Sequence, residues 1–245
     1  MKLNTSPLDI EFKENSLFLE NKKLEPGIRK LGDMRDVIYD AEFLEKADES
    51  RELYYMFRDV AREEDRDLIK KHHLRFDVTA IPSGTLGCEY VKTAGHYHPD
   101  MIPCKTFTEI YEVLEGKANY LLQRKKGEEV DNVVLVSAKK GDKLVIPSNY
   151  GHVTINPGKK TLVMSNWVCA DFNSDYSIYK EKRGAAYFQL DDGELIANDS
   201  YKDLPGVVDI SAELWEHNEP FSNTGNMYAL FLKKPEMFSF LTCGV

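Results

Sequence analysis

Short runs of alternating apolar and polar residues, separated by glycine and proline turns, dominate the middle of the chain. Strand-like runs include L-R-F-D-V-T-A-I-P, A-N-Y-L-L-Q, N-V-V-L-V-S and T-L-V-M-S-N-W-V, all lying after residue 73. Many short strands with turns between them are typical of a barrel or of two packed sheets. We therefore expect a mainly β protein whose core is formed by residues 74–204.

The two ends of the chain carry different patterns. Residues 1–73 contain short alternating runs and, over 33–46, a loose helical pattern, so they are expected to add edge strands and a short helix. Residues 205–245 contain two amphipathic runs, S-A-E-L-W-E-H and M-Y-A-L-F-L-K-K-P-E-M-F-S-F-L. This short helical extension is too small to bury a core alone. We expect it to cover the outer face of the barrel or a second subunit.

Composition narrows the function classes. A chain of 245 residues that is 42% hydrophobic can bury a full core, and no run resembles a signal peptide or a membrane span. We therefore predict a soluble, cytoplasmic protein without a membrane partner. The net charge is −9 and no extended basic stripe is present, so nucleic acid is not an expected partner. The four cysteines lack C-x-x-C spacing, which predicts free thiols rather than disulfides or a thiolate zinc site.

Three histidines are arranged to bind one metal ion. The stretch T-A-G-H-Y-H-P places His96 and His98 on the same face of a strand, because alternate strand residues face the same way. His152, in I-P-S-N-Y-G-H-V-T-I-N after a Gly-Asp turn, is the best candidate for a further ligand.

The carboxylate ligand is expected from the run 108–114. Its alternation puts Glu109 and Tyr111 on one face and Glu112 on the other, so Glu109 is the inward carboxylate. Three imidazoles and one carboxylate suit iron, zinc, manganese or nickel. We predict one divalent metal ion per chain.

These residues resemble the two motifs of the cupin superfamily: G-x-H-x-H with a following Glu and Gly, then a Gly-Asp turn and P-x-x-x-x-H. More narrowly, T-x-G-H-Y-H-P and the later T-E-I-Y-E-V-L-E-G-K-A-N-Y-L-L-Q are similar to cupin-type glucose-6-phosphate isomerases, found mainly in archaea. The likeness runs from about Arg29 to Asp203. It implies a double-stranded β-helix, or jelly roll, that holds a divalent metal, preferably iron, beside an open-chain sugar phosphate.

The resemblance also implies a set of substrate-binding residues: Tyr54, Thr79, Thr93, Gly95 and Tyr176. The two threonine hydroxyls and the backbone at Gly95 would hold the phosphate, and the tyrosines would face the sugar. A place for Tyr54 in the aromatic core fits the sequence equally well. Strand alternation puts Thr93 out of phase with His96, so either Gly95 marks a bulge or the assignment of Thr93 is wrong.

The chain departs from its relatives just before the last metal histidine. Asn149 and Tyr150 stand where many family members have a tyrosine and then a tryptophan, so sugar contacts from this loop are not carried over. The metal ligands are unaffected by the difference.

The activity implied is the interconversion of glucose 6-phosphate and fructose 6-phosphate, by a homodimer. In a proton-transfer route Glu109 lifts the C2 proton while Tyr111 orients a hydroxyl; in a hydride route hydrogen moves directly between C1 and C2. The sequence leaves both routes open. Two other classes also stay open, a metal-dependent cupin dioxygenase and a non-catalytic sugar-phosphate-binding cupin. The phosphate-binding set favours the isomerase, because a dioxygenase has no need of it.

Overall fold

The structure is a computed structural model and describes residues 1–103, 105–222 and 224–242. Cys104 and Cys243, two of the cysteines expected to be free thiols, lie outside these residues. Within the described part of the chain, no helix is both long and apolar enough to cross a membrane.

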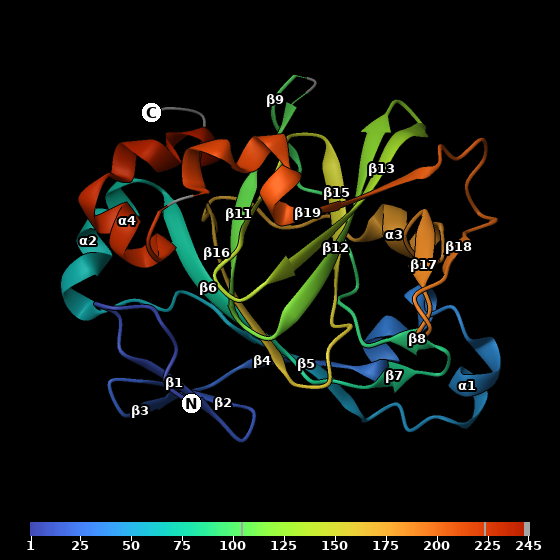
Figure 1. Ribbon diagram of the computed structural model, residues 1–245, viewed down its shortest axis with the longest axis horizontal. Helices are drawn as coiled ribbons and strands as arrows, with labels where there is room; N and C mark the ends of the chain where they lie inside the picture. Colours follow the sequence, from blue (N-terminus) through green and yellow to red (C-terminus); the bar gives the residue numbers. More distant parts are fainter. Residues whose placement is uncertain (104, 223, 243–245) are drawn as a thin grey trace.

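Two sheets form the body of the molecule (Figure 1). The larger sheet has the order β14-β11-β16-β6-β5-β4 and contains β4 (Gly27–Lys30), β5 (Glu52–Phe57), β6 (Leu74–Ile81), β11 (Glu109–Glu115), β14 (Lys143–Ile146) and β16 (Leu162–Cys169). The smaller sheet has the order β15-β12-β13-β19 and contains β12 (Lys117–Lys126), β13 (Glu129–Lys139), β15 (Tyr150–Ile155) and β19 (Val207–Ser211). The pairing of the described strands does not close the two sheets into one barrel. The expected mainly β fold is confirmed.

Short elements surround the two sheets. The remaining strands are β1 (Ile10–Lys13), β2 (Ser16–Leu19), β3 (Lys22–Leu24), β7 (Thr85–Leu86), β8 (Glu89–Tyr90), β9 (Asp100–Ile102), β10 (Lys105–Thr106), β17 (Tyr187–Gln189) and β18 (Leu195–Ala197). The helices are η1 (Leu31–Val37), α1 (Ala41–Lys46), η2 (Glu63–Asp65), α2 (Arg66–Lys71), α3 (Ser177–Glu181), η3 (Ala212–Leu214), η4 (Glu216–Phe221), α4 (Met227–Lys233) and η5 (Pro235–Leu241), where η marks a 3₁₀ helix. The division of the chain at residues 73 and 204 stays a prediction.

The helical pattern over 33–46 forms two separate helices rather than one. Residues 31–37 make a 3₁₀ helix, and α1 starts only at Ala41. Asp40 caps this second helix, because its side-chain oxygen accepts a hydrogen bond from the backbone N–H of Phe43 at 2.9 Å.

The hydrophobic core has two parts, one on each face of the larger sheet. In β16, Leu162 and Met164 pack into the cluster between the sheets, whereas Val163 and Trp167 pack into a second cluster on the outer face. Because both faces are covered, every residue of β16 is buried. This explains why the strand is nearly continuous in apolar residues.

The later part of the C-terminal extension, from Phe221 to Leu241, covers the outer face of the larger sheet, whereas β19 adds a strand to the smaller sheet (Figure 1). Phe231 and Phe238 are fully buried, with ring centroids 4.4 and 6.0 Å from that of Trp167. Of the two expected locations, this part of the extension therefore takes the one on its own chain, against the larger sheet. Its aromatic residues no longer require a second subunit to cover them, so the expected homodimer loses that support and stays a prediction.

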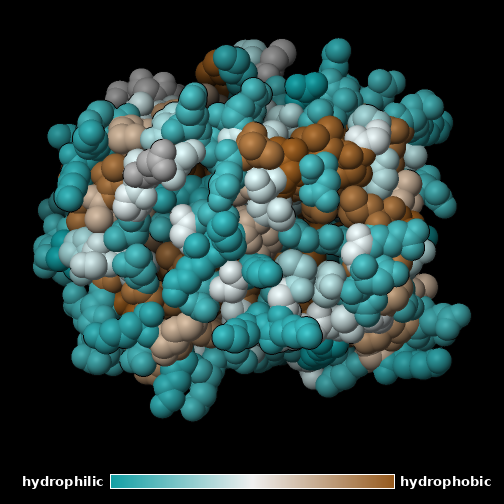
Figure 2. Space-filling view, in the orientation of Figure 1, coloured by the Kyte–Doolittle hydropathy of each residue, from teal (hydrophilic) through white to brown (hydrophobic). Residues whose placement is uncertain are grey.

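One face of the surface is largely hydrophilic, with an apolar area at the upper right over β19 and η3 (Figure 2). Two side chains on these elements are exposed, with Val208 at 50% and Leu214 at 72% of full accessibility. Single exposed apolar residues are common, whereas an apolar area on the surface can be covered by a partner.

Candidate metal centre and substrate cavity

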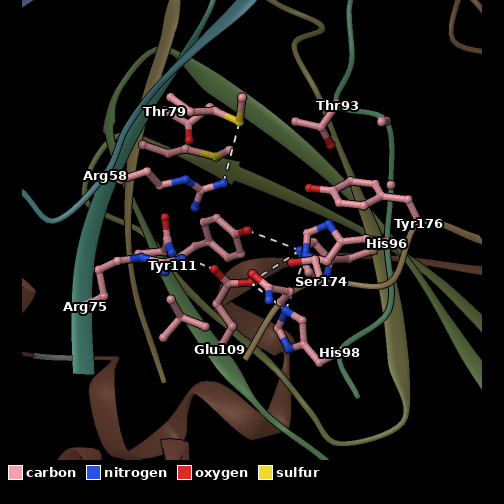
Figure 3. A pocket seen from close by; sticks show the side chains of 18 of the residues that line it. Arg58, Arg75, Thr79, Thr93, His96, His98, Glu109, Tyr111, Ser174 and Tyr176 are labelled. Carbon is pink, nitrogen blue, oxygen red and sulfur yellow. Dashed lines mark hydrogen bonds and ion pairs between the residues drawn. The ribbon is translucent and has the colours of Figure 1, made fainter. Parts of the chain in front are cut away.

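A cavity of about 270 Å³ lies on the inner face of the larger sheet (Figure 3). Its walls come from β5, β6, β11, β15 and β16, together with residues 93–98 and 172–176. Every residue predicted for the site lines this cavity: Tyr54, Thr79, Thr93, Gly95, His96, His98, Glu109, Tyr111, His152 and Tyr176. The structure therefore brings the whole predicted set together.

The predicted metal ligands converge at one end of the cavity. One ligand atom from each of His96, His98, Glu109 and His152 lies within 4.8 Å of all the others. The Oε2 atom of Glu109 is 3.3 Å from Nε2 of His98 and 3.4 Å from Nε2 of His152. His96 and His152 hydrogen-bond to each other through both backbone groups, so they lie directly opposite across two chain segments.

Hydrogen bonds outside the cluster orient two of these ligands. Nδ1 of His98 lies 3.0 Å from the carbonyl oxygen of Phe107, which fixes the proton on Nδ1 and turns the Nε2 lone pair toward the cluster. Oε1 of Glu109 accepts a hydrogen bond from Asn166 at 2.6 Å. Oε2 of Glu109 is buried and makes no hydrogen bond with any described residue. A buried carboxylate oxygen without a donor, facing three imidazoles, fits a bound divalent cation.

The protonation states of the cluster also fit a metal ion. Burial lowers the pKa of His152 to about 4 and, helped by the neighbouring imidazoles, lowers the pKa of His96 well below its usual range. Burial raises the pKa of Glu109, but its contacts with His98 and His152 outweigh this and leave the pKa below its ordinary value. At neutral pH, His96 and His152 are therefore neutral and Glu109 is ionised, as metal ligands need to be.

Tyr111 lies beside the cluster as a hydrogen-bond donor. Its hydroxyl oxygen is 3.1 Å from Nε2 of His152. Burial, together with the charge of Glu109, raises the pKa of Tyr111 well above its usual value. The hydroxyl therefore stays protonated at physiological pH and can donate a hydrogen bond to an oxygen of a bound molecule.

The conflict of strand phase between Thr93 and His96 is removed at Gly95. Gly95 has a φ of +77°, so regular strand alternation breaks there, and both Thr93 and His96 line the cavity. A side chain at Gly95 would place its Cβ 2.5 Å from the ring of Tyr179, so only glycine fits. Thr93 is held by the backbone of Thr154, which donates to the Thr93 hydroxyl at 2.9 Å.

Tyr54 is both a buried residue and part of the cavity wall. Its side chain is buried, and its hydroxyl oxygen accepts a hydrogen bond of 3.4 Å from the N–H of Ala94. The guanidinium of Arg29 lies 6.0 Å from the ring of Tyr54 and 5.4 Å from the ring of Tyr176. A place in the aromatic core and a place facing the cavity are therefore compatible for Tyr54.

Asn149 and Tyr150, where the chain departs from its relatives, form other contacts. The side-chain oxygen of Asn149 accepts a hydrogen bond from the backbone of Thr106, and the Tyr150 hydroxyl donates to Asn132. Asn149 thus holds the chain near β10 rather than facing the substrate cavity.

Two arginines that the sequence did not suggest for the site, Arg58 and Arg75, also line the cavity. Strand alternation would have found both. Tyr54 faces the cavity from β5, so Arg58 is on the same face four residues later; Thr79 faces it from β6, so Arg75 is on the same face four residues earlier. Asn166, also missed, lies opposite Tyr111 in the pairing of β16 with β11.

The chain resembles known proteins of one family in sequence. A family model described as glucose-6-phosphate isomerase (GPI) matches residues 28–206. A glucose-6-phosphate isomerase of Thermococcus litoralis is 27% identical over 197 residues, covering 80% of this chain and 96% of that protein. The one of Thermococcus gammatolerans is 31% identical over 166 residues, covering 68% and 80% respectively. The one of Pyrococcus horikoshii is 28% identical over 191 residues, covering 77% and 93%.

Solved structures resemble the chain more distantly. Oxalate decarboxylase from Bacillus subtilis matches with a TM-score of 0.37 and 17% identity, covering 54% of this chain and 30% of that one. Peruvianin-I, a cysteine peptidase from Thevetia peruviana latex, matches with a TM-score of 0.39 and 12% identity, covering 58% and 77%.

Proposed function

The chain belongs to the cupin-type glucose-6-phosphate isomerase family and is an isomerase, and we propose that its cavity interconverts glucose 6-phosphate and fructose 6-phosphate. One observation carries the proposal. Figure 3 shows His96, His98 and Glu109 at one end of the cavity and Thr79 and Thr93 at the other. A sugar phosphate can therefore reach from a metal ion to a phosphate-binding end.

We further propose that His96, His98, Glu109 and His152 hold a divalent cation, with iron as the physiological metal. Zinc, manganese and nickel suit the same donors. When bound, such a cation supplies Lewis-acid polarisation of the sugar carbonyl. The neutral imidazoles of His96 and His152 and the ionised carboxylate of Glu109 already have the protonation states that this requires.

The chain's own residues divide the remaining work. The Tyr111 hydroxyl stays protonated and orients an oxygen on C1 or C2 by donating a hydrogen bond. The lowered pKa of Glu109 makes it a somewhat weaker base, which counts against abstraction of the C2 proton and leaves direct hydrogen transfer from C2 to C1 as the other route. Thr79, Thr93 and the cavity-lining backbone at Gly95 bind the phosphate and so hold the reacting carbons at the cluster.

Location and assembly follow as further parts of the proposal. We expect the protein to act in the cytoplasm, where its phosphorylated substrates are made and retained. We also expect a homodimer, because cupin relatives pair through their sheet faces. The apolar area over β19 and η3 gives such a contact a surface to use.

A coupled assay tests the reaction. Protein loaded in turn with iron, zinc, manganese or nickel should convert glucose 6-phosphate to fructose 6-phosphate, and unphosphorylated glucose should be a poor substrate. Failure to isomerise any hexose phosphate with all four metals would refute the proposed function. Oxygen uptake with another substrate would then assign the chain to the dioxygenase class.

A further inference from the structure

A buried carboxylate on β6 holds two arginines at the cavity wall. Asp77 is fully buried and accepts hydrogen bonds from Nη1 of Arg58 at 2.5 Å, from Nε of Arg75 at 2.9 Å and from the backbone of Asp59 at 3.0 Å. Both arginine side chains reach the cavity that contains the metal cluster. The three charged groups thus form one connected unit beneath the cavity surface.

Strand pairing explains why these residues meet. On β5 and β6, Met56 pairs with Thr79, so the inward faces of the two strands lie side by side. Arg58 follows Met56 by two residues and Asp77 precedes Thr79 by two, which brings the guanidinium and the carboxylate together. The unit is therefore set by the register of two neighbouring strands and needs no flexible loop to form.

The charges of this unit do not balance. One carboxylate serves two guanidiniums, which leaves one positive charge in excess at the cavity wall of a protein whose net charge is −9. The ionised Glu109 also acts on Arg58, but its carboxylate faces the three imidazoles of the metal cluster. The excess cation therefore favours an anion from solvent, because a charge beside a low-dielectric wall is costly when it is not neutralised.

Arg58 has donors to spare for such an anion. Its side chain is 48% exposed, and apart from Asp77 its hydrogen-bond partner among the described residues is the sulfur of Met56, a weak acceptor, at 3.6 Å. Figure 3 shows the guanidinium of Arg58 reaching into the cavity near Thr79, whereas Arg75 lies lower, toward Glu109. Across the larger sheet, Asp77 pairs with Asn166 and Asn166 with Tyr111, so Arg58 lies level with this row, between Arg75 and Thr79.

We propose that Arg58 is a specificity-determining residue that pairs with the phosphate group of the substrate, with Asp77 and Arg75 as its positioning residues. This inference rests on the proposed function for the identity of the substrate. A guanidinium presents paired N–H donors that match two phosphate oxygens, and Asp77 restricts its rotation before the ligand arrives. The two threonine hydroxyls alone carry no charge, so Arg58 supplies the preference for a phosphorylated sugar over a neutral one.

Isothermal titration of the metal-loaded protein tests the inference, with inorganic phosphate and glucose 6-phosphate as separate probes. Arg58→Gln should weaken the binding of both by about 10- to 100-fold, as expected for the loss of a hydrogen bond to a charged group. Arg58→Lys should fall between wild type and Arg58→Gln, because an ammonium keeps the charge without the paired geometry. The KM for glucose 6-phosphate should rise more than kcat falls in Arg58→Gln.

Arg124→Gln is the matched control, because Arg124 also forms a paired ion contact, with Asp131, but does not line the cavity. It should bind both probes as wild type does. Asp77 keeps Arg75 as a partner in Arg58→Gln, which preserves the buried contact beneath the cavity.

Unchanged affinity for both probes in Arg58→Gln would overturn the inference, and a lowered Tm with unchanged affinity would show that Arg58 only bridges β5 and β6. These measurements distinguish a failure of this inference from a failure of the proposed function. If wild type isomerises glucose 6-phosphate and Arg58→Gln binds it equally well, the function stands and the inference falls. If wild type does not isomerise it but Arg58→Gln loses phosphate affinity, the function falls and Arg58 remains an anion-binding residue.

Discussion

Glu112 should make the stability of the protein depend on pH in a way that a single substitution removes. Its side chain is buried on the outer face of β11, opposite to Glu109, and its Oε2 atom accepts a hydrogen bond of 2.8 Å from the backbone of Met227 at the start of α4. Burial raises the pKa of Glu112 from 4.5 to about 7, although the Met227 hydrogen bond and Lys143 oppose the change.

The sign of the effect follows from proton binding. Between pH 4.5 and 7 the folded chain retains a proton on Glu112 that the unfolded chain has released. The free energy of unfolding contributed by this group therefore falls as the pH rises through this window. Each pKa unit corresponds to about 1.4 kcal/mol, so the full change amounts to about 3 kcal/mol.

Glu112→Gln should abolish this dependence, because an amide keeps an acceptor oxygen for Met227 and carries no charge. Denaturant unfolding at several pH values between 5 and 8 measures it. Between pH 5 and pH 8, the free energy of unfolding of wild type should fall by about 3 kcal/mol more than that of the variant. Glu128→Gln, which changes an exposed glutamate, should show the same pH dependence of the free energy of unfolding as wild type. The same pH dependence in wild type and Glu112→Gln would refute the reasoning.

Four further predictions concern the site and the assembly. Purified protein should carry about one divalent metal ion per chain, and elemental analysis should show that His96→Ala and His152→Ala each lose it; near-full occupancy in both would mean that other residues are the ligands. Thr79→Val combined with Thr93→Val should raise the KM for glucose 6-phosphate, and an unchanged KM would remove these hydroxyls from the phosphate site. Gly95→Ala should lower the free energy of unfolding by roughly 1–3 kcal/mol through its left-handed backbone and the contact with Tyr179, and a wild-type denaturation curve would contradict this. Light scattering should give twice the chain mass of 28.1 kDa, and a monomer mass would exclude the dimer.

The metal-ligand pattern could be predicted because it depends on local geometry. Alternation along one strand separates Glu109 from Glu112, and the structure places them on opposite faces of β11, one at the cavity and one against α4. The same rule relates His96 to His98, since both residues contribute to one cluster. No knowledge of the rest of the fold is needed for either step.

Other features depend on which distant segments come together, and the sequence alone did not predict them. The unit of Arg58, Asp77 and Arg75 exists only because β5 and β6 pair in one register, with a helical segment between them in the chain. The position of the C-terminal extension likewise depends on the contact between the ring of Phe231 and that of Trp167, which lies on the outer face of the sheet and 64 residues earlier in the chain. Pairing of remote segments is not encoded in any one stretch of residues.

The metal cluster takes its ligands from both sheets, since Glu109 belongs to β11 of the larger sheet and His152 to β15 of the smaller one. The distance between these ligand atoms therefore depends on the spacing of the two sheets. A substitution that changes the volume of the apolar core between the sheets, such as a smaller side chain at Leu122 or Met164, changes that spacing. Because metal coordination tolerates only a few tenths of an ångström, a repacked layer should alter metal affinity while the fold itself remains intact.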